Sequence, residues 1–97
     1  MILVRNVFQA KFGKADELVA VFKQAQQVLS ETAANQRILT DLSGPFHTVV
    51  LETQFENLAE WERSRAEMFT NPQLGAVFAR TNDLVESGHA EYYTIET

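Results

Sequence analysis

The stretch ILVRNVFQAKFGKADELVAVF, residues 2–22, changes its hydrophobic period at Gly13. Before this glycine, apolar and polar residues alternate, which predicts a strand over residues 2–12 with one mostly apolar face. That face carries one strongly polar residue, Asn6. After the glycine, apolar residues recur every three or four positions, which predicts an amphipathic helix over residues 15–30. A strand followed directly by a helix is therefore the first unit of the fold.

Two more strands and the start of a second helix follow. Residues 36–42 and 47–55 have strand composition, and Ser43-Gly44-Pro45-Phe46 between them is typical of a tight connection. These residues predict a hairpin. Asn57 then precedes Glu60 by three positions, the spacing of a capping box, in which side chains bind the free backbone amides of a helix start. A second helix is expected from this point.

The second helical region is expected to break in its middle. Asn71 and Pro72 combine an N-cap with a first-turn proline, so the chain should stop there and restart as a third helix. Gly88 is expected to end that helix, and residues 89–96 are expected to form a last strand. The apolar stripe of the third helix comprises Leu74, Val77, Phe78, Thr81, Leu84 and Val85.

The resulting order of elements is strand, helix, strand, strand, helix, strand. This order predicts a ferredoxin-like α+β fold with an antiparallel sheet. The whole chain, residues 1–97, is expected to form this single domain. Helices cover only one face of such a sheet. The other face is expected to hold Leu3, Val7 and either Val50 or Tyr92 beside polar residues. This mixture is too apolar to remain in water, so a homodimer formed through the sheet face is predicted.

Three segments carry a resemblance that covers nearly the whole chain. They are the opening strand Val4-Arg5-Asn6-Val7-Phe8, the turn Gly13-Lys14-Ala15-Asp16-Glu17-Leu18, and Val49-Val50-Leu51-Glu52 leading into Leu58-Ala59-Glu60-Trp61. With these segments the chain resembles the dimeric α+β barrel superfamily, which includes antibiotic-biosynthesis monooxygenases, haem-degrading monooxygenases and NIPSNAP-like proteins. Its long broken segment, residues 57–87, is most similar to a NIPSNAP-type member.

The resemblance also implies which residues would form a site. In the haem-degrading relatives, an Asn on the first strand, a Trp on the second helix and a His on the next helical segment shape the pocket and hold the iron. Asn6 and Trp61 match the first two positions. Neither His47 nor His89 lies on the helical segment after Trp61, so no cofactor is expected. The cofactor-free monooxygenases use Asn and Trp to bind and polarise an aromatic substrate, a role open to Asn6 and Trp61.

The faces of the predicted elements point to a small, mainly apolar pocket between the sheet and the second and third helices. Such a cavity with a few polar groups is the usual form of a small-molecule site. Residues of the first strand and of both helices are expected to line it, namely Asn6, Phe8, Trp61, Arg65 and Phe78.

Three of these residues have a simpler interpretation. Asn6 can pair with a neighbouring backbone group or a water molecule, and Trp61 can be ordinary core. Arg65 can form an ion pair with Glu60 or Glu62 on its own helix. The sequence leaves these alternatives open.

Composition excludes several other classes of function. Eight Lys and Arg against thirteen Asp and Glu give a net charge of −5 without a basic cluster, which argues against nucleic acid. No cysteine is present, so thiolate metal sites and disulfides are excluded. The apolar run Ile2-Leu3-Val4 is too short to span a membrane, and a cytoplasmic location is expected. His89 and Glu91 provide only two ligands on one strand face, so no metal site is predicted.

Two classes of function therefore remain. The first is a NIPSNAP-like dimer that binds a small apolar or aromatic molecule. The alternative is a cofactor-independent monooxygenase of the antibiotic-biosynthesis type, with a haem-degrading enzyme and a non-catalytic, partner-binding dimer less favoured. Whether the protein is an enzyme stays open at this stage.

Overall fold

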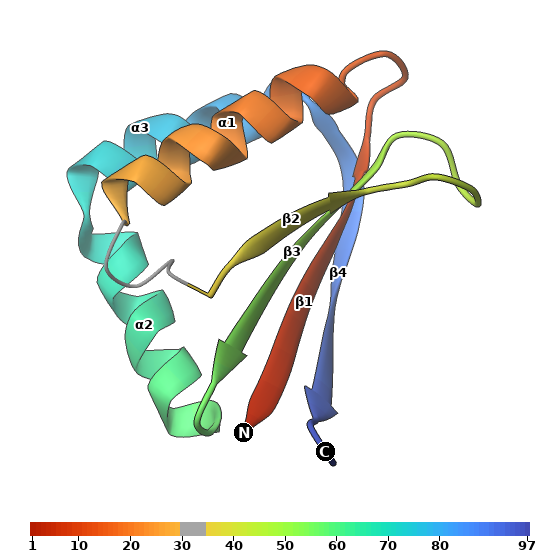
Figure 1. Ribbon diagram of the computed structural model, residues 1–97. Helices are drawn as coiled ribbons and strands as arrows, with labels where there is room; N and C mark the ends of the chain where they lie inside the picture. The colour runs from red at the N-terminus through yellow and green to blue at the C-terminus, as the bar shows by residue number, and fades with distance from the viewer. Residues whose placement is uncertain (30–34) are drawn as a thin grey trace.

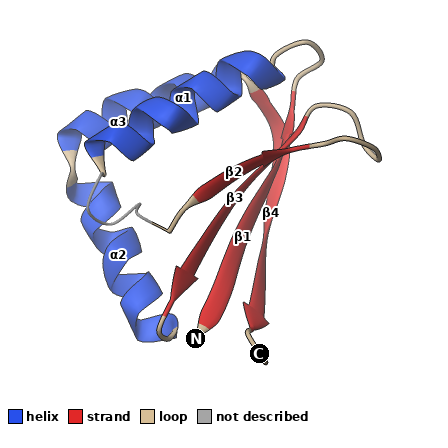
Figure 2. Ribbon diagram, viewed as in Figure 1, coloured by secondary structure: helices blue, strands red, loops and turns tan. Residues whose placement is uncertain are grey.

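The computed structural model describes residues 1–29 and 35–97. Its sheet has four antiparallel strands in the order β2-β3-β1-β4, and the helices lie together on one face of it (Figure 1). Figure 2 shows the same two layers by secondary structure. The elements are β1 (Ile2–Ala10), α1 (Ala15–Val28), β2 (Arg37–Thr40), β3 (Thr48–Phe55), α2 (Leu58–Thr70), α3 (Pro72–Ala79), the short 3₁₀ helix η1 (Arg80–Asp83) and β4 (Val85–Thr94). The ferredoxin-like α+β fold predicted from the sequence is confirmed.

The described elements are mostly shorter than their predicted ranges. β1 ends at Ala10 instead of residue 12, because Gly13 forms a turn with φ of 79°, in the left-handed region that glycine adopts without steric cost. β2 and β3 are each shortened at the hairpin, where the connection is wider than predicted. The expected last residue of the first helix, residue 30, lies outside the described residues.

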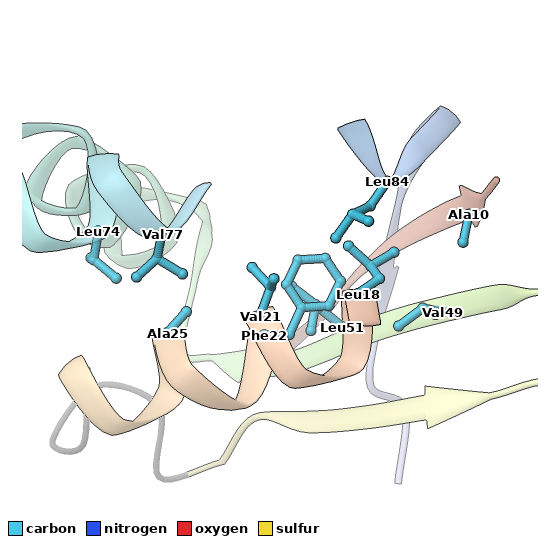
Figure 3. Packing of buried hydrophobic residues seen from close by; sticks show 10 residues of the cluster. All are labelled: Ala10, Leu18, Val21, Phe22, Ala25, Val49, Leu51, Leu74, Val77 and Leu84. Carbon is cyan, nitrogen blue, oxygen red and sulfur yellow. The ribbon is translucent and has the colours of Figure 1, made fainter. Parts of the chain in front are cut away.

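The core lies between α1 and the helix-facing side of the sheet. The buried residues of α1 are Leu18, Val21, Phe22 and Ala25, at the spacing of one helix face. They pack with Val49 and Leu51 of β3 and with Leu74 and Val77 of α3 (Figure 3). Each such apolar side chain contributes roughly 1.5–3 kcal/mol when fully buried, so this layer is the main source of stability.

The break between α2 and α3 is confirmed, and both helices begin at the predicted caps. The side chain of Asn57 accepts a hydrogen bond of 2.9 Å from the backbone N–H of Glu60. Asn71 accepts one of 3.0 Å from the backbone N–H of Gln73, with Pro72 at the start of the helix. α2 has no buried residue, in contrast to α1 and α3. Its contacts with the rest of the fold are made by half-buried side chains, among them Trp61 and Met68.

The predicted end of the third helix is wrong. α3 ends at Ala79 and β4 begins at Val85, so Gly88 lies inside a strand and does not terminate a helix. Gly88 pairs with Phe8 across the strands, and a Cβ atom at Gly88 would lie 3.3 Å from the Phe8 ring. A glycine is needed at this position because a larger residue would contact the Phe8 ring. This packing requirement, and not the end of a helix, explains why Gly88 is a glycine. Thr81, Leu84 and Val85 consequently do not belong to the helix.

The face of the sheet away from the helices carries an ion-pair network on a partly apolar background. Arg5 lies 3.4 Å from Glu52 through its Nε atom and 3.3 Å from Glu91 through Nη1, and Arg37 also pairs with Glu52. Glu52 is only 7% exposed. The pairing register places Leu3, Val7 and Val50 on this side, as predicted.

Of the two alternatives for that face, Val50 lies on it and Tyr92 does not. Tyr92 pairs with Val4, which faces the helices, and its ring contacts Trp61 of α2. Because side chains alternate along a strand, the residue on the uncovered face is the neighbouring Tyr93.

Candidate functional site

Two adjoining cavities lie between the sheet and helices α2 and α3. The larger has a volume of about 240 Å³ and the smaller a volume of about 50 Å³. Asn6 and Met68 line both, so the two spaces meet at these side chains. The larger is otherwise lined by Phe8, Phe22, Leu51, Phe69, Phe78 and Thr81. Polar side chains contribute more to the smaller one, through Gln36, Thr53, Ser64 and Arg65.

All five residues predicted to form the pocket line one of these two cavities. Phe8 and Phe78 border the larger, while Trp61 and Arg65 border the smaller. Asn6 belongs to both. The structure thus brings the five residues to one region between sheet and helices, but distributes them over two spaces.

Asn6 lies in the centre of the sheet, opposite Leu51 of β3 and Ala90 of β4. It is half-buried, no side-chain hydrogen bond of Asn6 occurs among residues 1–29 and 35–97, and its amide atoms are not among the fully buried unpaired atoms, so water or a ligand can reach them. The simpler interpretation, that its amide pairs with a neighbouring backbone group, therefore finds no support in the part of the chain that is described. An amide in such a position loses free energy unless water or a ligand binds it.

Trp61 is half-buried on α2 and faces β4. Its ring contacts that of Tyr92 edge to face, with centroids 5.2 Å apart and an interplanar angle of 79°. In this arrangement the electropositive edge of one ring points at the electronegative face of the other, which is favourable. The contact is a link between α2 and the sheet, and it fixes the Trp61 ring at the border of the smaller cavity.

Arg65 does not form the ion pair with Glu60 or Glu62 that was the simpler expectation. Its guanidinium carbon lies 5.6 Å from the centroid of Trp61 and 5.3 Å from that of Phe69, one helical turn on either side. Arg63 takes the acidic neighbours instead, pairing with Glu60 and with Glu67 at 3.6 Å. Phe69 is 72% exposed, so this stack lies where the cavities open to solvent.

Among the lining residues that the site prediction left out, Met68 is the one that borders both cavities. It is half-buried. The signal was its helical spacing, seven positions after Trp61, which places both side chains on the same side of α2. A methionine side chain is unbranched and adapts its shape readily, so the separation between the two spaces depends on a flexible group.

Both histidines lie away from the two cavities. His47 has a φ of 60°, accepts a 3.3 Å hydrogen bond from the backbone N–H of Gly13, and packs edge to face on Phe12 with centroids 4.7 Å apart. It thereby ties the hairpin to the turn before α1. His89 lies on the uncovered sheet face, with Nε2 3.1 Å from a carboxylate oxygen of Glu91. Among residues 1–29 and 35–97, no three His, Cys, Asp or Glu side chains converge as metal ligands would.

The resolved pKa shifts belong to groups outside the cavities. The pKa of Glu91 is lowered, chiefly by the hydrogen bond with His89 and then by that from Tyr93. The pKa of Arg63 is raised, chiefly by its hydrogen bond with Glu60. Neither Glu91 nor Arg63 lines one of the two cavities.

Among the helices described, none is long and apolar enough to cross a bilayer.

No curated protein matches the chain significantly. Solved structures match it over almost its full length, at identities that establish the fold alone. A protein from Agrobacterium tumefaciens shares 16% identity over 97% of this chain and 92% of its own, with a TM-score of 0.88.

Two further structures define the range of this likeness. A NIPSNAP-like domain protein from Burkholderia xenovorans shares 15% identity over 99% of this chain and 85% of its own, with a TM-score of 0.87. A Deinococcus radiodurans protein, provisionally assigned as an antibiotic biosynthesis monooxygenase, shares 15% identity over 100% and 94% of the two chains, with a TM-score of 0.73. The NIPSNAP family model matches residues 5–95. The chain belongs to the NIPSNAP family.

Proposed function

We propose that this protein binds a small apolar or aromatic molecule in the two cavities between the sheet and helices α2 and α3. The observation that carries the proposal is the side-chain amide of Asn6, which lacks a partner in the described part of the chain and lies where both cavities meet. The volume supports it too. An engineered apolar cavity of roughly 150 Å³ binds benzene, and the larger cavity here has about 240 Å³.

The walls of the larger cavity define the ligand's chemistry. Phe8, Phe22 and Phe78 offer aromatic surface, and Leu51 offers aliphatic surface. These side chains favour an apolar or aromatic ring, and the Asn6 amide can hydrogen-bond an oxygen on it. Binding of this kind places the ring beside Met68, next to the smaller cavity that Trp61 borders.

Fluorescence of Trp61, the only tryptophan, tests this proposal directly. Titration with aromatic and quinol-like compounds should give saturable quenching. Asn6→Ala should weaken binding of a carbonyl-bearing compound about fivefold, the worth of one ordinary hydrogen bond. Gln27→Ala, which removes an exposed amide from α1, is the matched control and should have no effect. If no compound gives saturable quenching, the proposal is wrong.

We further propose that two copies associate through the uncovered sheet face. Leu3, Val7 and Val50 form the apolar part of that face, and Glu52 forms ion pairs beside them. Equilibrium sedimentation at micromolar concentration should report about 22 kDa, twice the 11.0 kDa of one chain. A wild-type mass of one chain at that concentration would contradict the dimer.

A pair of arginine substitutions locates the interface. Val7→Arg introduces a charge into the centre of the sheet face and should shift the sedimentation mass toward that of the monomer. Ala20→Arg introduces the same charge on the exposed side of α1 and should leave the mass unchanged. Equal behaviour of the two variants would place the contact elsewhere.

A cofactor-independent monooxygenase of the antibiotic-biosynthesis type is the second candidate. It is supported by the placement of Asn6 and Trp61 around the same small cavity and by the fold shared with the Deinococcus radiodurans protein. An oxygen electrode with a dihydroxynaphthalene as substrate tests it. If the protein is such an enzyme, oxygen uptake should saturate with substrate, and Asn6→Ala should reduce it. Oxygen uptake no faster than in buffer alone would rule out the enzyme and keep only the binding function.

Domain organisation and location complete the proposal. One shared core between the helices and the sheet supports a single domain over residues 1–97. The lack of cysteine suits a reducing compartment, which supports a cytoplasmic location.

A further inference from the structure

We infer that the bound molecule is a carboxylate, with an apolar body in the larger cavity and its anionic group beside Arg65. This inference rests on the proposed binding function and specifies the ligand class of the same site. It draws on three properties of the site, namely its charge, the availability of the Arg65 donors and the uneven distribution of polar groups.

The charge of the site is opposite in sign to that of the whole chain. Arg65 is the single charged side chain among the described residues that line either cavity. No Asp or Glu of residues 1–29 and 35–97 lines them, although the chain carries a net charge of −5. The charge of the described lining residues therefore favours an anion next to Arg65.

The hydrogen-bond donors of Arg65 are available to a ligand. Its guanidinium group stacks on Trp61 and Phe69 and forms no ion pair within the described chain, whereas Arg63 on the same helix is paired twice. A cation–π contact of this kind uses the charge of the guanidinium group and does not occupy its N–H donors in an ion pair, so these donors can bind a carboxylate. The two rings also limit the motion of the side chain, which reduces the entropy lost on binding.

Polar groups are concentrated in the smaller cavity. Gln36 and Thr53 already lie within 3.4 Å of each other, but Ser64 and Asn6 have no side-chain partner among the described residues. Both can donate a hydrogen bond, which an anion requires. The smaller cavity, with a volume of about 50 Å³, can hold more than one water molecule but is too small for an aromatic ring. The smaller cavity therefore fits a carboxylate group that is attached to a ring in the larger cavity.

A neutral and a charged probe of the same shape test this assignment. 2-Naphthoate and 2-naphthamide differ by the charge of one group, and isothermal titration calorimetry avoids the optical overlap of naphthalene with Trp61. Wild-type protein should bind naphthoate about fivefold more tightly than naphthamide, the factor expected for one partly exposed ion pair. This preference should shrink as salt is raised, because mobile ions screen an exposed charge.

Two substitutions on α2 separate the role of Arg65 from the general charge of the helix. Arg65→Met should abolish the preference for naphthoate while naphthamide binds as before, and Arg65→Lys should restore part of it. Arg63→Met removes the same charge two positions away and should keep the full preference. Thermal unfolding of each variant verifies the fold, and the salt dependence of the wild type tests the ion pair without any substitution.

The outcomes distinguish this inference from the proposed function. Equal binding of the two probes by the wild-type protein would overturn the carboxylate assignment and leave the binding proposal standing. A preference that survives Arg65→Met in a folded variant, or that Arg63→Met removes equally, would also overturn it. If neither probe binds, the proposed function and this inference both fail.

Discussion

Replacing Glu52 by Gln should destabilise the protein far more than a similar change on a helix surface. Glu52 lies on β3 with 7% exposure and pairs with Arg5 at 3.4 Å and with Arg37. Glutamine keeps the size of the side chain but removes the charge that both guanidinium groups face. The substitution thus leaves Arg5, whose side chain is 32% exposed, with Glu91 as its one acidic neighbour among the described residues.

The expected cost follows from how far each partner is buried. Removing one member of a fully buried pair costs about 3–5 kcal/mol, whereas exposed pairs contribute about 0.2–1 kcal/mol. Glu52 is buried, but the side chains of Arg5 and Arg37 are 32% and 68% exposed, so an intermediate loss of about 2 kcal/mol is expected. For a chain of 97 residues the unfolding entropy is about 0.2 kcal/mol/K, and the melting temperature should fall by about 10 °C.

Urea and thermal unfolding at pH 7, followed by circular dichroism, provide the measurement. The control is Glu67→Gln, which removes an exposed carboxylate 3.6 Å from Arg63 and should cost less than about 0.5 kcal/mol. If the two substitutions lower stability equally, the network on the uncovered sheet face has no special role, and the reasoning from burial is refuted.

Three other perturbations have expected outcomes. Asn71→Ala should lower stability by about 1 kcal/mol in urea unfolding, because the N–H of Gln73 loses its cap at the start of α3. The pKa of Glu91 is lowered below 4.5 in the fold, chiefly by His89, so its stabilising effect is complete above that pH and is lost as pH falls through the folded pKa. Urea unfolding from pH 7 to 3 should therefore show the wild type losing its advantage over Glu91→Gln, and a constant difference would contradict this. Met68→Ala should widen the junction between the two cavities, cost about 1–2 kcal/mol because Met68 is half-buried, and let the three-ring probe anthracene-2-carboxylate bind in calorimetry.

The sequence predicted the elements whose signals are local. Asn57 and Asn71 act through atoms two or three residues away, so their capping roles and the break between α2 and α3 follow from short patterns. The place of Gly88 did not follow from such a pattern, because it depends on the ring of Phe8 in another strand. The face of Tyr92 likewise depends on where β4 starts, and a shift of one residue exchanges the two sides of a strand.

The candidate site shows the same limit. Alternation on β1 and helical spacing on α2 and α3 placed Asn6, Trp61 and Phe78 on surfaces that face one another. The partner of Arg65 could not be derived in this way, because acidic and aromatic neighbours both occur within one helical turn of it. The division into two cavities depends on the packed position of Met68, which spacing alone does not determine.

The absence of buried residues in α2 gives the site a thermodynamic property that a rigid pocket lacks. A helix with few buried contacts detaches from its sheet at a smaller free-energy cost than the whole fold requires to unfold. In the proposed binding mode, a molecule between α2 and the sheet adds apolar contacts to those that Met68 and Trp61 already make. If the proposed ligand binds there, occupancy of the cavities and docking of α2 are linked equilibria, in which each favours the other by the same free energy.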